Sequence, residues 1–487
     1  MRRRQLYAAI TFAVALLLTP GVAAGHGALR RSEPAAGARL GAAPRVLRLT
    51  FTERPEIQFT RVELLGPDSA AIALGPLALE SARTVRAEVR GALVRAGKYT
   101  VVWQMAGADG HPVRGRFSFT IAPGASGLAS EQPRGEPAAV SVTPPGQAAT
   151  PQATAHHDPV SMPDAGEGFG AESPLYVAVR WLGYSALLVV LGAVSFRWVV
   201  LAILRRRAPS ERSAALVPFA SRRAASLGLA AAVALGLAAL MRLLAQSYAM
   251  HGSADALNGG LVGAMVARTV WGTGWLLQVA GVVVALGGFL AARRDRAFGW
   301  VLAALGAVTL AFSAALSGHA ASSPRLAGLA VLADALHVLG AGGWLGSLFV
   351  VIGAGVPAAL AVAGRAEERG PAVADLVNAF SPTALAFAGV VAVTGLFAGW
   401  LHLGSLPALW QSAYGRTLLV KLAVLSVVAG TGAYNWLRAR PALGDVDGAR
   451  RIRRSASLEL AVGAVVLVIT AVLVATPTPM DVTAMTQ

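Results

Sequence analysis

The chain contains no cysteine among its 487 residues. This absence excludes disulfide bonds, thiolate metal sites and cysteine nucleophiles, so a metal ligand must be His, Asp, Glu, Met or the free amino terminus. Charged residues are also scarce at 14%, whereas hydrophobic residues make up 55% of the chain. Long apolar runs explain this balance better than one large soluble core does.

Acidic residues are few, with 25 Asp and Glu against 42 Lys and Arg, which gives a formal net charge of +17. Such a charge could indicate a nucleic-acid partner. The basic residues, however, lie mostly in short loops between apolar runs, where membrane topology explains them better. We therefore expect the lipid bilayer as a partner, and no nucleic acid. The chain also lacks the G-x-x-x-x-G-K-[ST] loop that would bind ATP.

Residues 1–25 are typical of a secretory signal peptide, with a basic start, an apolar run through Leu18 and small residues before the cut. Cleavage after Gly25 makes His26 the first residue of the mature chain, whereas cleavage after Ala24 leaves Gly25 there. A terminal His can offer both its α-amine and its ring nitrogen to one metal. An internal His cannot form this chelate.

Residues 26–122 predict a small all-β domain. Apolar and polar residues alternate over 46–51, 62–65, 99–105 and 117–121, and turn-forming residues separate these runs. Several short strands at this spacing predict a sandwich or a Greek-key barrel. The last two strands are joined by a Gly-rich connection that carries Asp109 and His111. Their side chains can converge on one metal because the backbone between them is compliant, although a turn Asp beside an exposed His is the plainer interpretation.

Four stretches of this domain resemble the CopC copper-binding family: His26–Ala35, Leu49–Glu53, Gly97–Trp103 and Ala108–Gly115. The resemblance implies a Cu(II) site built from the amine and ring of His26 together with Asp109 and His111. Nitrogen and carboxylate ligands suit Cu(II). Some members of the family carry a second, methionine-rich Cu(I) site. Because this domain has only Met105, we do not expect one here.

Residues 123–172 are rich in Pro, Ala, Gly and Ser, which is typical of a flexible linker. His156 and His157 stand out within it. They are either solvated linker residues or a transient copper relay between the two domains.

Eight apolar runs long enough to span a bilayer follow, so residues 173–487 predict an α-helical membrane domain of eight transmembrane helices. The runs lie at about 175–203, 224–248, 270–292, 298–318, 327–355, 382–403, 417–437 and 456–475. A β domain outside the membrane makes the first helix run inward and leaves the C-terminus outside. The predicted inner loops are rich in arginine, whereas the outer loops carry only Arg268, Arg325 and Arg416. This asymmetry agrees with the positive-inside rule.

Three histidines, His251, His319 and His402, fall at the predicted outer ends of helices. They are ordinary interfacial residues or a set of copper ligands that faces the β domain. Asp334 and His337 lie deeper in the fifth run, and their spacing puts both side chains on one helix face. An ionisable pair at that depth needs the bundle interior, a partner or a water-filled cavity. The pair either lines a metal path or forms a polar clamp with Arg180 or Arg242.

The membrane half resembles the CopD family, or the CopC–CopD fusions of the YcnJ type. The matching stretches are Ser317–Ala320, Asp334–His337, Gly343–Gly346, Phe380–Pro382, Thr394–Gly395, Trp400–Ser405, Tyr414–Lys421 and Asn435. The resemblance implies handling of copper, as Cu(I) or Cu(II), in the bacterial cytoplasmic membrane, usually described as uptake. It also implies His319, His337 and His402 as residues that carry the metal.

Together these features predict a copper-binding membrane protein, not an enzyme. The chain would capture Cu(II) outside the cytoplasmic membrane and pass it to the membrane domain for import and homeostasis, with other extracytoplasmic copper chaperones as further partners. Two alternatives stay open. One is an oxidative enzyme with a copper brace, against which Asp109 argues because it would crowd the oxygen position. The other is an electron-transfer protein with haem held between histidines such as His319 and His402.

Overall fold

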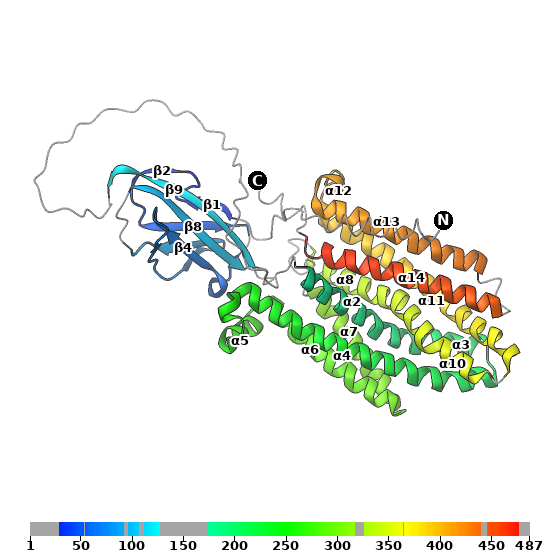
Figure 1. Ribbon diagram of the computed structural model, residues 1–487. Helices are drawn as coiled ribbons and strands as arrows, with labels where there is room; N and C mark the ends of the chain where they lie inside the picture. Colours follow the sequence, from blue (N-terminus) through cyan, green and yellow to red (C-terminus); the bar gives the residue numbers. More distant parts are fainter. Residues whose placement is uncertain are drawn as a thin grey trace, which may run out of the picture.

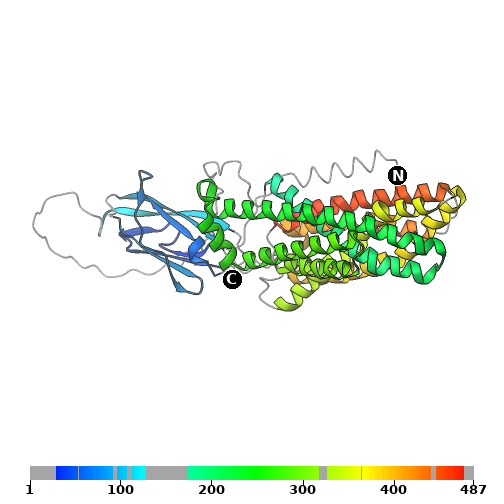
Figure 2. The ribbon, with the colours of Figure 1, turned by 90° about the horizontal axis from the view of Figure 1, so that it is seen from below.

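The computed structural model describes residues 29–52, 54–91, 96–106, 112–126, 173–316, 326–363, 365–439 and 446–476. A β-sandwich lies beyond one end of a long helix bundle, so the two halves are arranged end to end (Figures 1 and 2). The end of the bundle that faces the sandwich is called the near end below, and the opposite end the far end. The expected fold class is confirmed.

The sandwich consists of two sheets. One sheet has the order β1-β3-β7-β6, and the other has the order β2-β9-β8-β4-β5. The pairing of β2 with β9 is parallel, whereas β8 and β9 form a long antiparallel hairpin. The strands are β1 (Leu29–Glu33), β2 (Arg39–Ala42), β3 (Val46–Phe51), β4 (Arg61–Leu65), β5 (Ala71–Ile72), β6 (Ala78–Ser81), β7 (Thr84–Glu88), β8 (Gly97–Ala106) and β9 (Pro112–Ser126), with a short helix η1 (Ile57–Phe59) before β4.

The alternation in the sequence defines the core of the sandwich. In β8, every second side chain from Tyr99 to Met105 is buried, and β9 contributes Phe117, Phe119 and Ile121. The rings of Tyr99 and Phe119 stack at 5.7 Å across the hairpin. Cross-strand aromatic pairs of this kind fix the register of a hairpin. The registers of β8 and β9 are therefore set by the same residues that predicted these strands.

Eight helical segments among the described residues are long and apolar enough to cross a membrane. This finding agrees with the eight apolar runs in the sequence. The segments are Pro174–Arg207, Glu211–Gly252, Val270–Arg293, Ala297–Leu316, Gly328–Val362, Glu367–Leu403, Ala413–Leu437 and Arg454–Leu473. Five segments correspond to single helices: α4 (Glu211–Asp255), α6 (Val270–Arg293), α7 (Ala297–Leu316), α11 (Ala366–Leu403) and α14 (Val446–Leu473). The first segment consists of α2 (Pro174–Ser195), η2 (Phe196–Val200) and α3 (Leu201–Arg207), and the seventh consists of α13 (Ala413–Tyr434) and η5 (Asn435–Ala439). The fifth segment consists of α8 (Ala327–Ala341), η3 (Gly342–Gly346), α9 (Ser347–Val350), η4 (Val351–Gly355) and α10 (Val356–Val362).

Two helices begin well before the predicted apolar runs. Helix α4 begins at Glu211, where Ser210 and Ser213 form a reciprocal capping box. Helix α11 begins at Ala366 and continues through Pro371 and Pro382. The apolar windows missed both starts because the first turns are polar. The short helices α5 (Gly259–Arg268) and α12 (Ala408–Gln411) at the near end were also not predicted.

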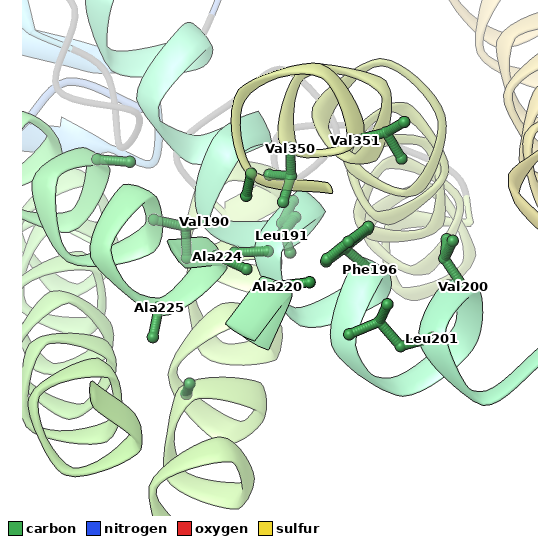
Figure 3. Packing of buried hydrophobic residues seen from close by; sticks show 14 of the residues in the cluster. Val190, Leu191, Phe196, Val200, Leu201, Ala220, Ala224, Ala225, Val350 and Val351 are labelled. Carbon is green, nitrogen blue, oxygen red and sulfur yellow. The ribbon is translucent and has the colours of Figure 1, made fainter. Parts of the chain in front are cut away.

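Small side chains let the helices of the bundle pack closely. Figure 3 shows Val190 and Leu191 of α2 beside Ala220 and Ala224 of α4 and near Val350 of α9. Gly346 of η3 lies against the backbone of α2, where an added Cβ would overlap the carbonyl oxygen of Leu188. Close backbone approach at small residues is the usual way in which membrane helices associate. It holds the fifth helical segment, which carries Asp334 and His337, firmly against α2.

Candidate functional site

The predicted capture site lies largely outside the described residues. His26, Asp109 and His111 belong to residues 1–28 and 107–111, and His156, His157 and His319 are likewise in undescribed segments. The strand ends on either side of residues 107–111 are described. Ala106, the last residue of β8, pairs with Pro112, the first residue of β9. The three-residue copper site therefore stays a prediction.

The same end of the hairpin is docked on the near end of α4. Gln104 Nε2 donates a hydrogen bond to the carbonyl oxygen of Met250 at 2.8 Å, and Arg114 Nη2 donates to that of Ala249 at 3.0 Å. Gln104 and Arg114 are opposite each other in the hairpin, and Arg114 Nε donates to Gln104 Oε1 at 2.8 Å. The last carbonyls of a helix have no partner within it, so these two side chains cap α4.

A backbone break in α4 makes this capping possible. Gly252 has φ +77°, a conformation that glycine adopts readily and that ends helices. An apolar cluster and an ion pair complete the contact. The cluster joins Phe59 of the sandwich to Met250, Met265 and Trp271, and Arg61 lies 3.9 Å from Asp255.

His251 lies under the docked sandwich, in the last turn of α4 before Gly252. The sequence placed it after the second apolar run, whereas the helix extends to include it. Its side chain is 95% buried, and its ring centroid lies 5.9 Å from that of Phe59. Nδ1 lies 3.1 Å from Ser247 Oγ. Nε2 is buried and has no hydrogen-bond partner among the described residues.

Asp334 and His337 lie one turn apart on α8, as the sequence predicts. His337 Nδ1 is 3.0 Å from Thr394 Oγ1 of α11, and the same hydroxyl donates to the carbonyl oxygen of Val390 at 2.6 Å. The hydroxyl proton is therefore engaged, and Nδ1 must donate to Thr394. Gly395 leaves room for the ring, because a Cβ there would lie 3.3 Å from His337 Cε1.

The basic side chain nearest in influence to this pair is Lys421 of α13, which interacts electrostatically with both Asp334 and His337. The sequence analysis included Lys421 only as part of a family motif. A lysine within an apolar run was the available signal. The two arginines that had been considered as clamps have other contacts. Arg180 Nη1 donates to the carbonyl oxygen of Ala471 at 3.4 Å, and Arg242 Nη1 donates to Gln278 Oε1 at 2.7 Å.

His402 lies in the last turn of α11, and its ring meets that of Tyr414 edge-on at 6.2 Å. The following helix, α12, lies at the near end of the bundle (Figure 1). Within the described residues, no three His, Asp or Glu side chains are grouped so that they could hold one metal ion. The structure thus brings Asp334 and His337 together, but keeps His251 and His402 on separate helices.

A second buried acid, Glu459 of α14, was missed by the sequence analysis. It accepts hydrogen bonds from Trp344 Nε1 at 3.3 Å and from Asn435 Nδ2 at 3.4 Å. Together with Arg369 it lines a mainly apolar cavity of about 940 Å³. A lone glutamate inside an apolar run was the signal that could have found it.

Family models match three parts of the chain. Residues 29–122 match the CopC domain, residues 170–329 match the N-terminal domain of copper resistance protein D-like proteins, and residues 374–473 match copper resistance protein D. The second and third matches cover most of the eight helical segments. The site residues His251 and His402 fall within these matches, whereas Asp334 and His337 lie between them.

Named relatives agree with these matches. The chain is 26% identical to the copper transport protein CutJ of Bacillus subtilis over 95% of this chain and 76% of the relative. It is 30% identical to copper resistance protein D of Pseudomonas syringae pv. tomato over 61% of this chain and 94% of the relative. The crystal structure of PcoC, a methionine-rich copper resistance protein from Escherichia coli, matches at 28% identity over 20% of this chain and 100% of that one, with a TM-score of 0.18.

The two sequence relatives are named as a copper transport protein and a copper resistance protein. The multi-pass helical architecture agrees with a membrane domain of the CopD kind. With a CopC domain and a CopD domain joined in one polypeptide, the chain belongs to the CopC–CopD family of copper transport and resistance proteins.

Proposed function

We propose that this protein captures Cu(II) outside the bacterial cytoplasmic membrane and passes it through the membrane domain into the cell. His26, Asp109 and His111 would hold Cu(II) in the β domain, which spans residues 26–122 behind a signal peptide. The observation that carries the proposal is the docking of the β8–β9 hairpin on α4. His111 directly precedes β9, and Arg114 of that strand contacts the turn of α4 that contains His251.

His251 and His402, together with His319 outside the described residues, would receive the metal, and Asp334 with His337 would line the passage. Two features support this role for the intramembrane pair. Thr394 fixes the orientation of the His337 ring, and a fixed imidazole is the usual state of a metal-binding histidine. Lys421 interacts electrostatically with Asp334, so the acid has a basic partner of the kind that intramembrane carboxyl groups usually have.

The loop charges support an orientation with the β domain and the C-terminus outside the membrane. Arg205, Arg206 and Arg207 lie at the end of α3, at the far end of the bundle. By the positive-inside rule, arginine-rich ends of this kind favour the cytoplasmic side. The proposed route therefore runs from the near end inward.

The test is the copper content of cells that lack the native protein and carry either no copy, the wild-type chain or a variant, at limiting external copper. We expect the wild-type chain to raise cellular copper. We expect His337→Ala to abolish the increase while the purified chain keeps its Cu(II) affinity, because the capture residues are in the other domain. Leu336→Ala is the matched control, since Leu336 is an exposed neighbour on the same helix.

The direction of any change decides between functions. Lower copper in cells with the wild-type chain would mean efflux or detoxification, and the import proposal would be wrong. An unchanged copper content would favour sensing, electron transfer or delivery. Copper uptake that is unchanged in the His337→Ala variant would show that His337 is not on the copper path.

A further inference from the structure

The docked contact between the sandwich and the bundle contains a buried imidazole nitrogen that the fold does not use. Most buried polar atoms in proteins have a hydrogen-bond partner, and each exception requires an explanation. His251 Nε2 is such an exception among the described residues. The rest of the side chain is well held, since Nδ1 contacts Ser247 and the ring lies beside Phe59.

The hydrogen bonds around Ser247 determine which nitrogen of His251 carries the proton. Ser247 Oγ donates its only proton to the carbonyl oxygen of Ala256 at 2.6 Å. The hydroxyl can then only accept from His251 Nδ1, which must carry a hydrogen. In the neutral ring Nε2 is therefore unprotonated, with its lone pair free in a buried position. A histidine that binds a metal through Nε2 needs this tautomer. In metal sites it is usually fixed by a hydrogen bond from the other ring nitrogen to a neighbouring group, which is the role that Ser247 has here.

Two methionines pack in one cluster with Phe59, the residue whose ring lies beside His251. They are Met250 and Met265, which are 2% and 0% exposed. Methionine thioethers with an imidazole favour Cu(I) over harder ions. The cluster includes a residue of the sandwich and residues of the bundle, so it is complete only when the two halves are docked.

We propose that the docked interface is a Cu(I) site of its own, in which His251 Nε2 is the anchoring ligand and Met250 or Met265 supplies a thioether sulfur. The site takes copper that is already Cu(I), so the proposal includes no redox step. Phe59 covers the ligands and keeps water from them. The inference rests on the proposed function, which takes copper as the cargo and counts His251 among the residues that receive it.

The site is tested in the full chain, purified in detergent, with His26→Ala and His111→Ala introduced to remove the predicted Cu(II) ligands. Two probes are titrated against a competing chelator in separate experiments: Ag(I) without any reductant, and Cu(I) kept reduced by ascorbate under anaerobic conditions. We expect one equivalent to bind. Ser247→Ala should weaken binding by about tenfold or more, as loss of an orienting partner does, and His251→Ala should weaken it further.

Matched substitutions separate ligand loss from damage to the fold. Met265→Leu keeps the side-chain volume and, if Met265 is the donor, removes sulfur scattering from the Cu(I) X-ray absorption spectrum, whereas Met241→Leu, at an exposed methionine, should not remove it. Met250→Leu is tested in the same way, and one of the two buried methionines must be the donor. Leu257→Ala, at an exposed residue close to His251 in the chain, is the control for the histidine.

Two outcomes would overturn the proposal. Ag(I) binding that is as tight in His251→Ala as in its parent would exclude the anchoring ligand, and equal weakening in Leu257→Ala would show a general effect on folding. The result is independent of the import proposal, because it is an affinity for a monovalent ion in a chain without the Cu(II) ligands. Failure of uptake would leave it standing.

Discussion

At the scale of single residues, the most informative position is Gly395, which lies against the His337 ring. A Cβ at 395 would lie 3.3 Å from His337 Cε1, closer than ordinary van der Waals contact. Gly395→Ala should therefore displace the ring and lower copper uptake several-fold, because metal-binding groups tolerate displacements of only about 0.5 Å. Gly399→Ala, one turn later on α11, meets its nearest neighbour at 4.0 Å and should leave uptake unchanged. Equal uptake by both variants would contradict the role of the His337 orientation.

Residue-scale prediction from the sequence succeeded where the signal was local. Asp334 and His337 were found because both lie in one apolar run and share a helix face. Lys421 and Thr394, which contact or interact with them, come from two other helices, and no local pattern links them to α8. The burial of His251 was not predictable, since it results from a contact between two separate domains.

At the scale of secondary-structure elements, the contact between η3 and α2 sets the position of the fifth helical segment. Gly346→Ala should destabilise the protein by about 1–3 kcal/mol, because the added methyl group overlaps the α2 backbone and must be accommodated by strain. Gly183→Ala on α2 is the control, since its Cβ would meet Ala238 at an ordinary 3.6 Å. Thermal unfolding in detergent measures both variants. Equal melting temperatures would show that the contact is less tight than the structure indicates.

Long elements were predicted more accurately than short ones. The eight apolar runs correspond to the eight long helical segments, and alternation found β3, β4, β8 and β9. The short strands β2 and β6 were missed because their side chains are mostly exposed, so they carry no apolar periodicity. The polar first turns of α4 and α11 were missed because a hydropathy window detects the membrane-spanning part of a helix rather than its start.

At the scale of the whole molecule, the cysteine-free sequence allows a direct test of orientation. A cysteine introduced at Ser405, at the near end, or at Arg296, at the far end, is the only thiol in the chain. We expect a membrane-impermeant maleimide to label Ser405→Cys in intact cells, and to label Arg296→Cys only after the membrane is disrupted. The opposite pattern would reverse the proposed orientation and, with it, the direction from which the β domain captures metal.

The sequence predicted the two halves and their order, but not their contact. The two residues that cap α4, Gln104 and Arg114, are ordinary polar residues of a hairpin, and the carbonyls that they bind belong to the backbone. Because every residue has a backbone carbonyl, a sequence pattern does not indicate which carbonyls accept these hydrogen bonds. The docking of a domain on a helix end is therefore a property that only the folded molecule shows.

Among the described residues, the contact between sandwich and bundle includes two side chains on backbone carbonyls, one ion pair, one apolar cluster and the ring contact of Phe59 with His251. If the two domains were separate proteins, these interactions alone would give weak binding. Within one chain β9 and α2 are covalently connected, so docking is an intramolecular event with an effective concentration set by that connection. Docking is thus unimolecular, and its frequency does not depend on how many copies of the protein the cell makes. Contacts that would be insufficient between separate proteins can therefore keep the hairpin beside His251.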